Sequence, residues 1–221
     1  MGKPNLVPLS TLISLPEGMA KRYLEPLRET LAVIDSVHRV EPRSRLTVTL
    51  DGGRPHTAEY KSLHRSPGKP AHIRQYRSAS EPHMTFAHEL AHFIDNRLLH
   101  PLSAVFASSY DDLLVPLLEA ISLSPQLVHI QRMLEGHRPP LSPKDRKFLR
   151  YLLESQELFA RTYAQFIAGK SNHPAMEDQL RFRQGTPQLI CGIPVSLQWD
   201  SHSFEPIMNA MESMLRLKGW S

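Results

Sequence analysis

The chain has 221 residues, of which 41% are hydrophobic and 22% are charged, and its formal net charge is +4 at pH 7. These proportions are ordinary for a soluble globular protein, and the mild positive charge permits an acidic partner without requiring one. The single cysteine, Cys191, excludes an intrachain disulfide and a multi-cysteine metal site. No stretch approaches about 18 uninterrupted apolar residues, so we expect no membrane span.

Residues 1–221 are long enough for one domain, which we expect to begin with an irregular segment at residues 1–16. That segment contains one lysine and a weak apolar run broken by three prolines, and it lacks the cleavage site of a signal peptide. We therefore expect a cytoplasmic protein, or one that is secreted as an effector without a classical signal peptide.

The first half of the chain combines one helix with a small sheet. Residues 17–40 place apolar side chains at three- and four-residue steps, which predicts a helix with a break or kink at Pro26. Residues 45–62 change to a two-residue alternation around the turn-forming sequence at 51–53, which predicts a β-hairpin. Residues 71–77 are expected to form a third, short strand.

Most of the remaining chain is expected to be helical. The next helix is predicted to begin with Ser80 at its N-cap and to end near Leu99, before Pro101. Proline-rich joints at residues 139–143 and 184–194 are expected to be turns. Further helices are predicted at residues 109–122, 125–136, 143–169 (in one or two pieces), 174–183 and 203–217. These elements indicate a mostly helical α+β fold.

The sequence HELAH at residues 88–92 stands within the predicted helix at 80–99. Residues four apart lie above one another on a helix, so His88 and His92 present two imidazoles to one point and Glu89 lies beside it. This is the H-E-x-x-H arrangement of two zinc ligands and a general base. The helix is apolar nearly all round, and polar side chains buried there would be destabilising without a partner. We therefore predict that His88 and His92 bind zinc and are not merely structural histidines. His83 lies off this face, and we expect it to be a surface or capping residue.

A catalytic zinc site needs a third protein ligand. Glu157 is the predicted one, because the residues stacked with it at helical spacing are all apolar and a lone carboxylate on a buried stripe needs a partner. Glu154 lies on a mixed, wetter face of the same predicted helix. The small residues Ala160 and Ala164 on the stripe would let this helix pack closely against the helix that carries HELAH.

Two alternative third ligands and one alternative role for Glu157 stay open. Asp95 lies one turn beyond His92, although its expected role is to hydrogen-bond to His92 or to nearby backbone. His100 lies at the end of the same helix. An ordinary helical pair of Glu157 with Arg161 would leave the site without this carboxylate.

The segments HELAHFIDN and ELFARTYAQFI resemble the gluzincin group of zinc metallopeptidases. They look most like the anthrax lethal factor type of catalytic domain and related domains of phages and mobile elements. In that group the glutamate of a later E-x-F-A helix completes an H-E-x-x-H-x-x-D helix. The resemblance therefore implies His88, His92 and Glu157 as zinc ligands, Glu89 as the general base and Asp95 as the aspartate of the group.

The resemblance also implies a tyrosine that stabilises the oxyanion, seven residues before the glutamate ligand. This chain has Arg150 at that position and Tyr151 one step later. Tyr151 is therefore the candidate oxyanion donor, and Tyr163 is a less favoured one. Each tyrosine has the alternative role of an ordinary core aromatic.

The resemblance implies a zincin-like fold, in which an edge strand of a twisted sheet runs above the active-site helix and could hold an extended peptide as an added strand. The expected function is a Zn²⁺-dependent endopeptidase that acts on a protein or peptide, with Glu89 as general base. One alternative is an inactive zincin fold that binds proteins. The other is a nucleic-acid-binding module using basic residues at 64–77 and 144–147, which the small net charge makes unlikely.

Overall fold

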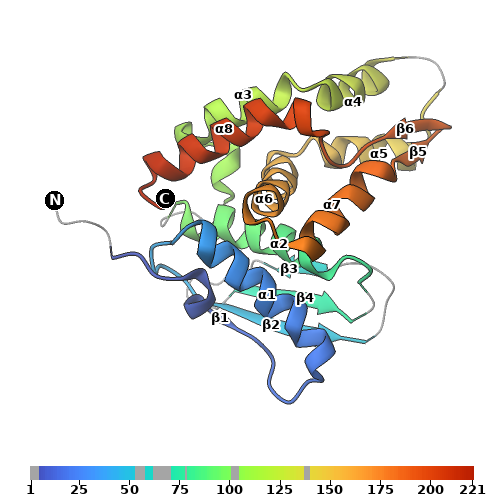
Figure 1. Ribbon diagram of the computed structural model, residues 1–221. Helices are drawn as coiled ribbons and strands as arrows, with labels where there is room; N and C mark the ends of the chain where they lie inside the picture. The colour runs from blue at the N-terminus through green and yellow to red at the C-terminus, as the bar shows by residue number, and fades with distance from the viewer. Residues whose placement is uncertain (1–4, 53–57, 62–70, 78, 101–104, 137–139) are drawn as a thin grey trace.

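The computed structural model describes residues 5–221 apart from 53–57, 62–70, 78, 101–104 and 137–139. In the described chain a four-stranded mixed sheet lies at one end and helices make up most of the rest (Figure 1). The predicted mostly helical α+β fold is therefore confirmed.

The described α-helices are α1 (Lys21–Val37), α2 (Pro82–Phe93), α3 (Val115–Ser122), α4 (Pro125–Glu135), α5 (Pro143–Leu152), α6 (Ser155–Ser171), α7 (Pro174–Gly185) and α8 (Ser201–Leu217). The strands are β1 (Ile13–Ser14), β2 (Leu46–Asp51), β3 (Ala58–Lys61), β4 (Ala71–Tyr76), β5 (Gln188–Ile190) and β6 (Ile193–Val195). Short 3-10 turns are η1 (Leu9–Leu12), η3 (Ala107–Ser109) and η4 (Asp112–Leu114), and a π-helical segment, η2 (Ile94–Leu98), directly follows α2.

The strand order of the larger sheet is β1-β2-β4-β3. β2 runs parallel to β4, whereas β3 runs antiparallel to β4 with Tyr60 opposite Ile73. The predicted hairpin at residues 45–62 is therefore wrong, because β4 lies between its two strands. Their alternating pattern is typical of any half-buried strand and does not identify the neighbouring strand.

Two segments expected to be irregular or turns contain short strands. Within residues 1–16, β1 pairs in parallel with β2 and follows the turn η1, whose Leu9 is fully buried. Within residues 184–194, β5 begins a hairpin with β6 that turns at Cys191 and Gly192. Both turn residues have positive φ, 50° and 78°, as a two-residue hairpin turn of type I′ requires. Strands of two or three residues are too short to show an alternation in sequence.

The predicted helices are present, with changes at their ends. α1 continues through Pro26 without the expected break, because its apolar face is buried in the core and outweighs one lost backbone hydrogen bond. α2 begins one residue later than predicted, with Glu81 at the N-cap in place of Ser80 and Pro82 as the first helical residue. The helical segment predicted at 143–169 in one or two pieces is two helices, α5 and α6.

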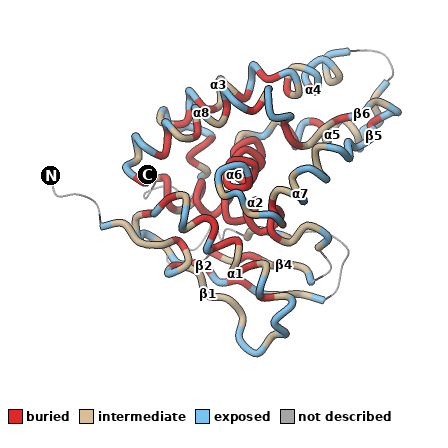
Figure 2. The backbone as a smooth tube through the Cα atoms, viewed as in Figure 1, coloured by how far each residue is buried: buried red, intermediate tan, exposed pale blue. Residues whose placement is uncertain are grey.

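The central element is α6, and residues 157–168 of this helix are all buried. Figure 2 shows α6 buried around its circumference, between the sheet side of the molecule and the layer of α3 and α8. α2 and α6 form the largest contact between two helices, and Ala160 and Ala164 are fully buried. Polar side chains of α2 and α6 therefore meet inside the protein.

No single described helix is long and apolar enough to cross a membrane. Asp112–Ser122 and Pro125–Glu135 reach that length and composition only as a pair, and they are bent by 77° where they meet.

Candidate metal centre

His88 and His92 lie one turn apart on α2, with ring centroids 4.8 Å apart. Glu157 from the first turn of α6 reaches both histidines. Its Oε2 lies 3.4 Å from His88 Nε2, and its Oε1 lies 3.1 Å from His92 Nε2. All three ligand atoms lie within 4.8 Å of one another. The structure therefore brings together the three residues predicted as zinc ligands.

These distances fit a bound metal ion. Two ligands about 2.1 Å from a tetrahedral ion lie about 3.4 Å apart. The separations between the two histidines and Glu157, 3.4 Å from His88 to Oε2 and 3.1 Å from His92 to Oε1, are close to this value. Two imidazoles and one carboxylate are also a donor set found in catalytic zinc sites. The three residues therefore form a candidate site for a divalent transition-metal ion.

The three ligands interact strongly with one another. Burial alone would raise the pKa of Glu157, but hydrogen bonds from His88 and His92 and their charges outweigh burial and hold the pKa well below its usual range. Burial would lower the pKa of His92, but the hydrogen bond and charge of Glu157 prevail and raise it. Glu157 is therefore ionised at neutral pH, and protons compete with a metal ion for the imidazole nitrogens.

Glu89 lies beside the ligands and is only 7% exposed. Its Oε2 accepts a hydrogen bond of 2.6 Å from the backbone N–H of Tyr60 in β3. The described cluster of ligands does not include Glu89. The carboxylate is therefore placed next to the site and not within it.

Two of the three ligands, His88 and Glu157, line a cleft of about 560 Å³. Its polar lining residues include His88, Glu89 and Glu157, and its aromatic lining residues include Phe148, Tyr151 and Phe182. The cleft is large enough to admit part of a peptide or a small molecule.

Tyr151, the candidate oxyanion donor, lines this cleft and is 42% exposed. Partial burial, the charge of Glu157 and a hydrogen bond to that carboxylate raise the pKa of Tyr151, so its hydroxyl stays protonated. The alternative, Tyr163, is wrong, because it is fully buried and its hydroxyl lies 2.7 Å from His38 Nε2.

Asp95 is fully buried and lies outside the described cluster of ligands, as does His100. The carboxylate of Asp95 accepts 2.7 and 2.6 Å hydrogen bonds from the backbone N–H and the hydroxyl of Ser108. Burial raises the pKa of Asp95 to about 6, although these hydrogen bonds act in the opposite direction. Of the roles considered for Asp95, the structure supports binding of nearby backbone.

Glu157 does not form the helical ion pair that was its alternative. The guanidinium of Arg161 donates to the backbone carbonyls of Leu152 and Leu197, and its Nε donates to the backbone carbonyl of Glu157. Glu154 is exposed and accepts a hydrogen bond from Gln156, as expected for the wetter face.

Tyr60 and Phe106 were not identified from the sequence, although both contact His92. The ring of Tyr60 stacks on His92 with centroids 6.2 Å apart, and its hydroxyl donates to Asn96 Oδ1. The ring of Phe106 lies 5.8 Å from the same imidazole. An aromatic residue in a strand or loop is usually part of the core, so only the positions of β3 and of the residue before η3 beside His92 reveal this role.

Comparison of the chain with protein-family models, with curated proteins and with solved structures gives no match in any of the three. The function of the centre must therefore be argued from its geometry.

Proposed function

We propose that this chain is a Zn²⁺-dependent endopeptidase of the gluzincin type, built on a zincin-like fold. The observation that supports the proposal is the convergence of His88, His92 and Glu157 beside a cleft that His88, Glu157 and the carboxylate of Glu89 line. The His-His-Glu donor set matches that of catalytic zinc in metallopeptidases.

The residues of the centre divide the work of peptide hydrolysis. His88, His92 and Glu157 would hold a zinc ion, which supplies a Lewis acid and lowers the pKa of water from about 15.7 toward about 7. Glu89 would take the proton of the attacking water and pass it to the leaving amine. Tyr151, whose hydroxyl keeps its proton, would donate a hydrogen bond to the oxyanion.

The position of β3 supports a peptide as the substrate. β3 is the last described strand on its side of the sheet. In an antiparallel pair, the N–H and C=O groups of alternate residues point to the same edge of a strand, so those of Ala58 and Tyr60 share one edge. The N–H of Tyr60 donates to Glu89, so this edge of β3 faces α2 and not β4. Ala58 also lines the cleft. The N–H of Tyr60 already donates to Glu89, so an extended peptide could pair with the remaining groups of this edge while its backbone passes the metal centre.

Replacement of Glu89 tests the proposal. Glu89→Gln keeps the size of the side chain but removes its basic carboxylate, so we expect an unchanged zinc content and hydrolysis at least ~10²-fold slower. The measurements are metal analysis of protein prepared without chelator and cleavage of an unbiased peptide library. Glu154→Gln is the matched control and should cleave like the parent protein, because the side chain of Glu154 is exposed and, among the described residues, bonds only to Gln156.

Two outcomes would contradict the mechanism. A Glu89→Gln protein that cleaves at the parental rate removes Glu89 as the base. A parent protein that binds zinc but cleaves no peptide makes protein binding by an inactive centre the better account.

A further inference from the structure

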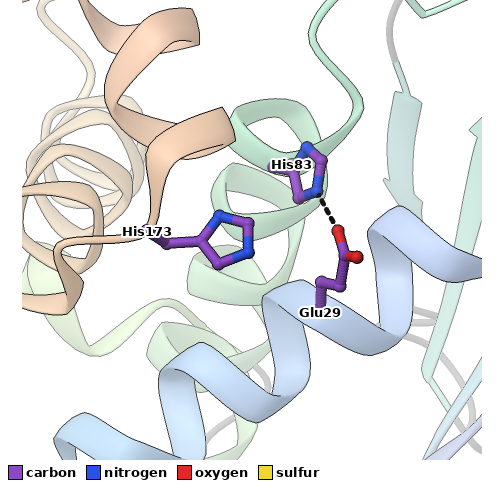
Figure 3. Close-up of side chains that lie close together, drawn as sticks. All are labelled: Glu29, His83 and His173. Atoms are coloured by element: carbon purple, nitrogen blue, oxygen red, sulfur yellow. Dashed lines mark hydrogen bonds and ion pairs between the residues drawn. The ribbon is translucent and has the colours of Figure 1, made fainter.

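A second cluster of histidine and glutamate lies on the opposite side of α2. His83 precedes His88 by five residues and therefore points about 140° away from it around the helix. It was expected at the surface or at a cap, but it is only 6% exposed. Figure 3 shows His83 facing Glu29 of α1 and His173, the residue before α7.

The three side chains are close enough to share one ion. Their ligand atoms all lie within 4.8 Å of one another, and His83 Nε2 lies 2.9 Å from Glu29 Oε2. The rings of His83 and His173 have centroids 5.4 Å apart. The side chain of Glu29 is 43% exposed, so water can reach the cluster and occupy a remaining position on an ion.

His173 supplies a second, independent observation. Neither of its ring nitrogens bonds to a described residue, although Nδ1 is buried. It stands at the N-cap of α7 but makes no side-chain capping bond. A buried imidazole nitrogen without a partner is destabilising, and an ion shared with His83 and Glu29 would give this ring a role.

The neighbour Gln179 determines the tautomer of His83. Gln179 Oε1 accepts the backbone N–H of Met84 at 3.0 Å, so its amide nitrogen faces His83 Nδ1 at 2.9 Å. His83 Nδ1 is therefore the acceptor, and Nε2 carries the proton that it donates to Glu29. An ion at Nε2 would replace that proton, and Nδ1 would then need an acceptor.

Gln179 is therefore expected to weaken the binding of an ion. To accept from His83 Nδ1–H, its amide must turn over, and the N–H of Met84 then faces an NH₂ group. A carboxylate at the same position would accept from both groups at once, which is the arrangement usual around metal-bound histidine.

We propose that Glu29, His83 and His173 form a second site for a divalent transition-metal ion, with Zn²⁺ as the test ion. Its ligands come from α1, from α2 and from the start of α7. The ion would therefore link α1 and α7 to the side of α2 that faces away from His88. With three protein ligands, an exposed side and the opposing amide of Gln179, this site should bind zinc more weakly than the His88 centre.

Zinc titration of the full chain tests the proposal. Metal is removed first, and calorimetry then follows the binding of the added zinc. The parent should bind two ions per chain in two phases. His173→Ala should lose only the weaker phase, and His88→Ala should lose only the tighter one. Gln179→Glu should tighten the weaker phase about tenfold, the lower end of what an outer-shell partner contributes.

The proposal is overturned if His173→Ala keeps both phases, or if Gln179→Glu binds the weaker ion no more tightly than the parent. Because Gln179→Glu is a gain of affinity, misfolding of a variant cannot imitate it. Loss of the tighter phase alone bears on the proposed peptidase and not on this second site.

Discussion

Glu157 is the residue on which the candidate metal centre depends most, because it is the one acidic member of the described cluster and it contacts both histidines. We expect Glu157→Ala to weaken zinc binding at this centre by more than ~10²-fold, since loss of an outer-shell partner alone reaches that figure. Competition with a chromogenic chelator measures the change.

Glu154→Ala provides the comparison, because Glu154 lies three residues away on the same helix end but is exposed. It should bind zinc as the parent does. Equal losses in both variants would show that the effect comes from the helix end and not from a ligand.

Tyr151 separates a catalytic contact from a binding contact. In Tyr151→Phe the ring still lines the cleft, but the protonated hydroxyl next to Glu157 is gone. We expect kcat to fall about 10–100-fold with little change in KM, because Tyr151 is partly exposed and an oxyanion donor acts only in the transition state. Steady-state kinetics on one cleaved peptide measures both constants. A rise in KM at constant kcat would instead make Tyr151 a substrate-binding residue.

At the scale of elements, the segment after His92 explains why Asp95 does not join the ligands. The helix changes from α to π at Ile94, so residues beyond this point no longer stack at steps of three or four. The carboxylate of Asp95 accepts hydrogen bonds from Ser108 and so links the π-helical segment η2 to the turn η3, which contains Ser108.

We therefore expect Ser108→Ala to lower the free energy of unfolding by about 1–3 kcal/mol, because a buried carboxylate loses one of its donors. Urea denaturation of the metal-free protein measures it, and metal analysis should find the zinc content unchanged. Ser122→Ala removes an exposed hydroxyl bonded to a backbone carbonyl and should change stability by less than about 0.5 kcal/mol. A similar loss in both variants would mean that Asp95 does not depend on Ser108.

The elements that carry the metal centre could be predicted from local pattern. Helical spacing alone places His88 and His92 together, and an apolar stripe identifies Glu157 as a carboxylate that needs a partner. The strand order could not be predicted in this way, because β2, β3 and β4 have similar patterns. The environment of His83 could not be predicted either, since its partners lie on helices far away in the sequence.

At the scale of the whole molecule, the packing of α1 against α6 creates a buried histidine that belongs to neither candidate metal cluster. His38 ends α1, accepts from the hydroxyl of Tyr163 on α6 and stacks on Trp220 near the end of the chain. Burial lowers the pKa of His38 to about 4, and the hydrogen bond to the backbone of Arg39 only partly offsets it. The folded protein therefore holds His38 in its neutral form over most of the acid range.

This histidine should make the folded state sensitive to acid. Between pH 6.5 and about 4 the unfolded chain binds a proton at His38 that the folded chain does not, so stability falls as the pH is lowered through this window. At about 1.4 kcal/mol per pKa unit, the contribution is about 3 kcal/mol. The quantity to follow is the difference in the free energy of unfolding between the metal-free parent and His38→Gln. We expect this difference to decrease by about 3 kcal/mol from pH 6.5 to pH 4. Urea denaturation at each pH measures the difference, in which the effects of all other groups cancel. His202→Asn, which changes an exposed histidine of α8, is the control and should show no such trend. A difference for His38→Gln that stays constant with pH would mean that His38 is protonated in the folded state.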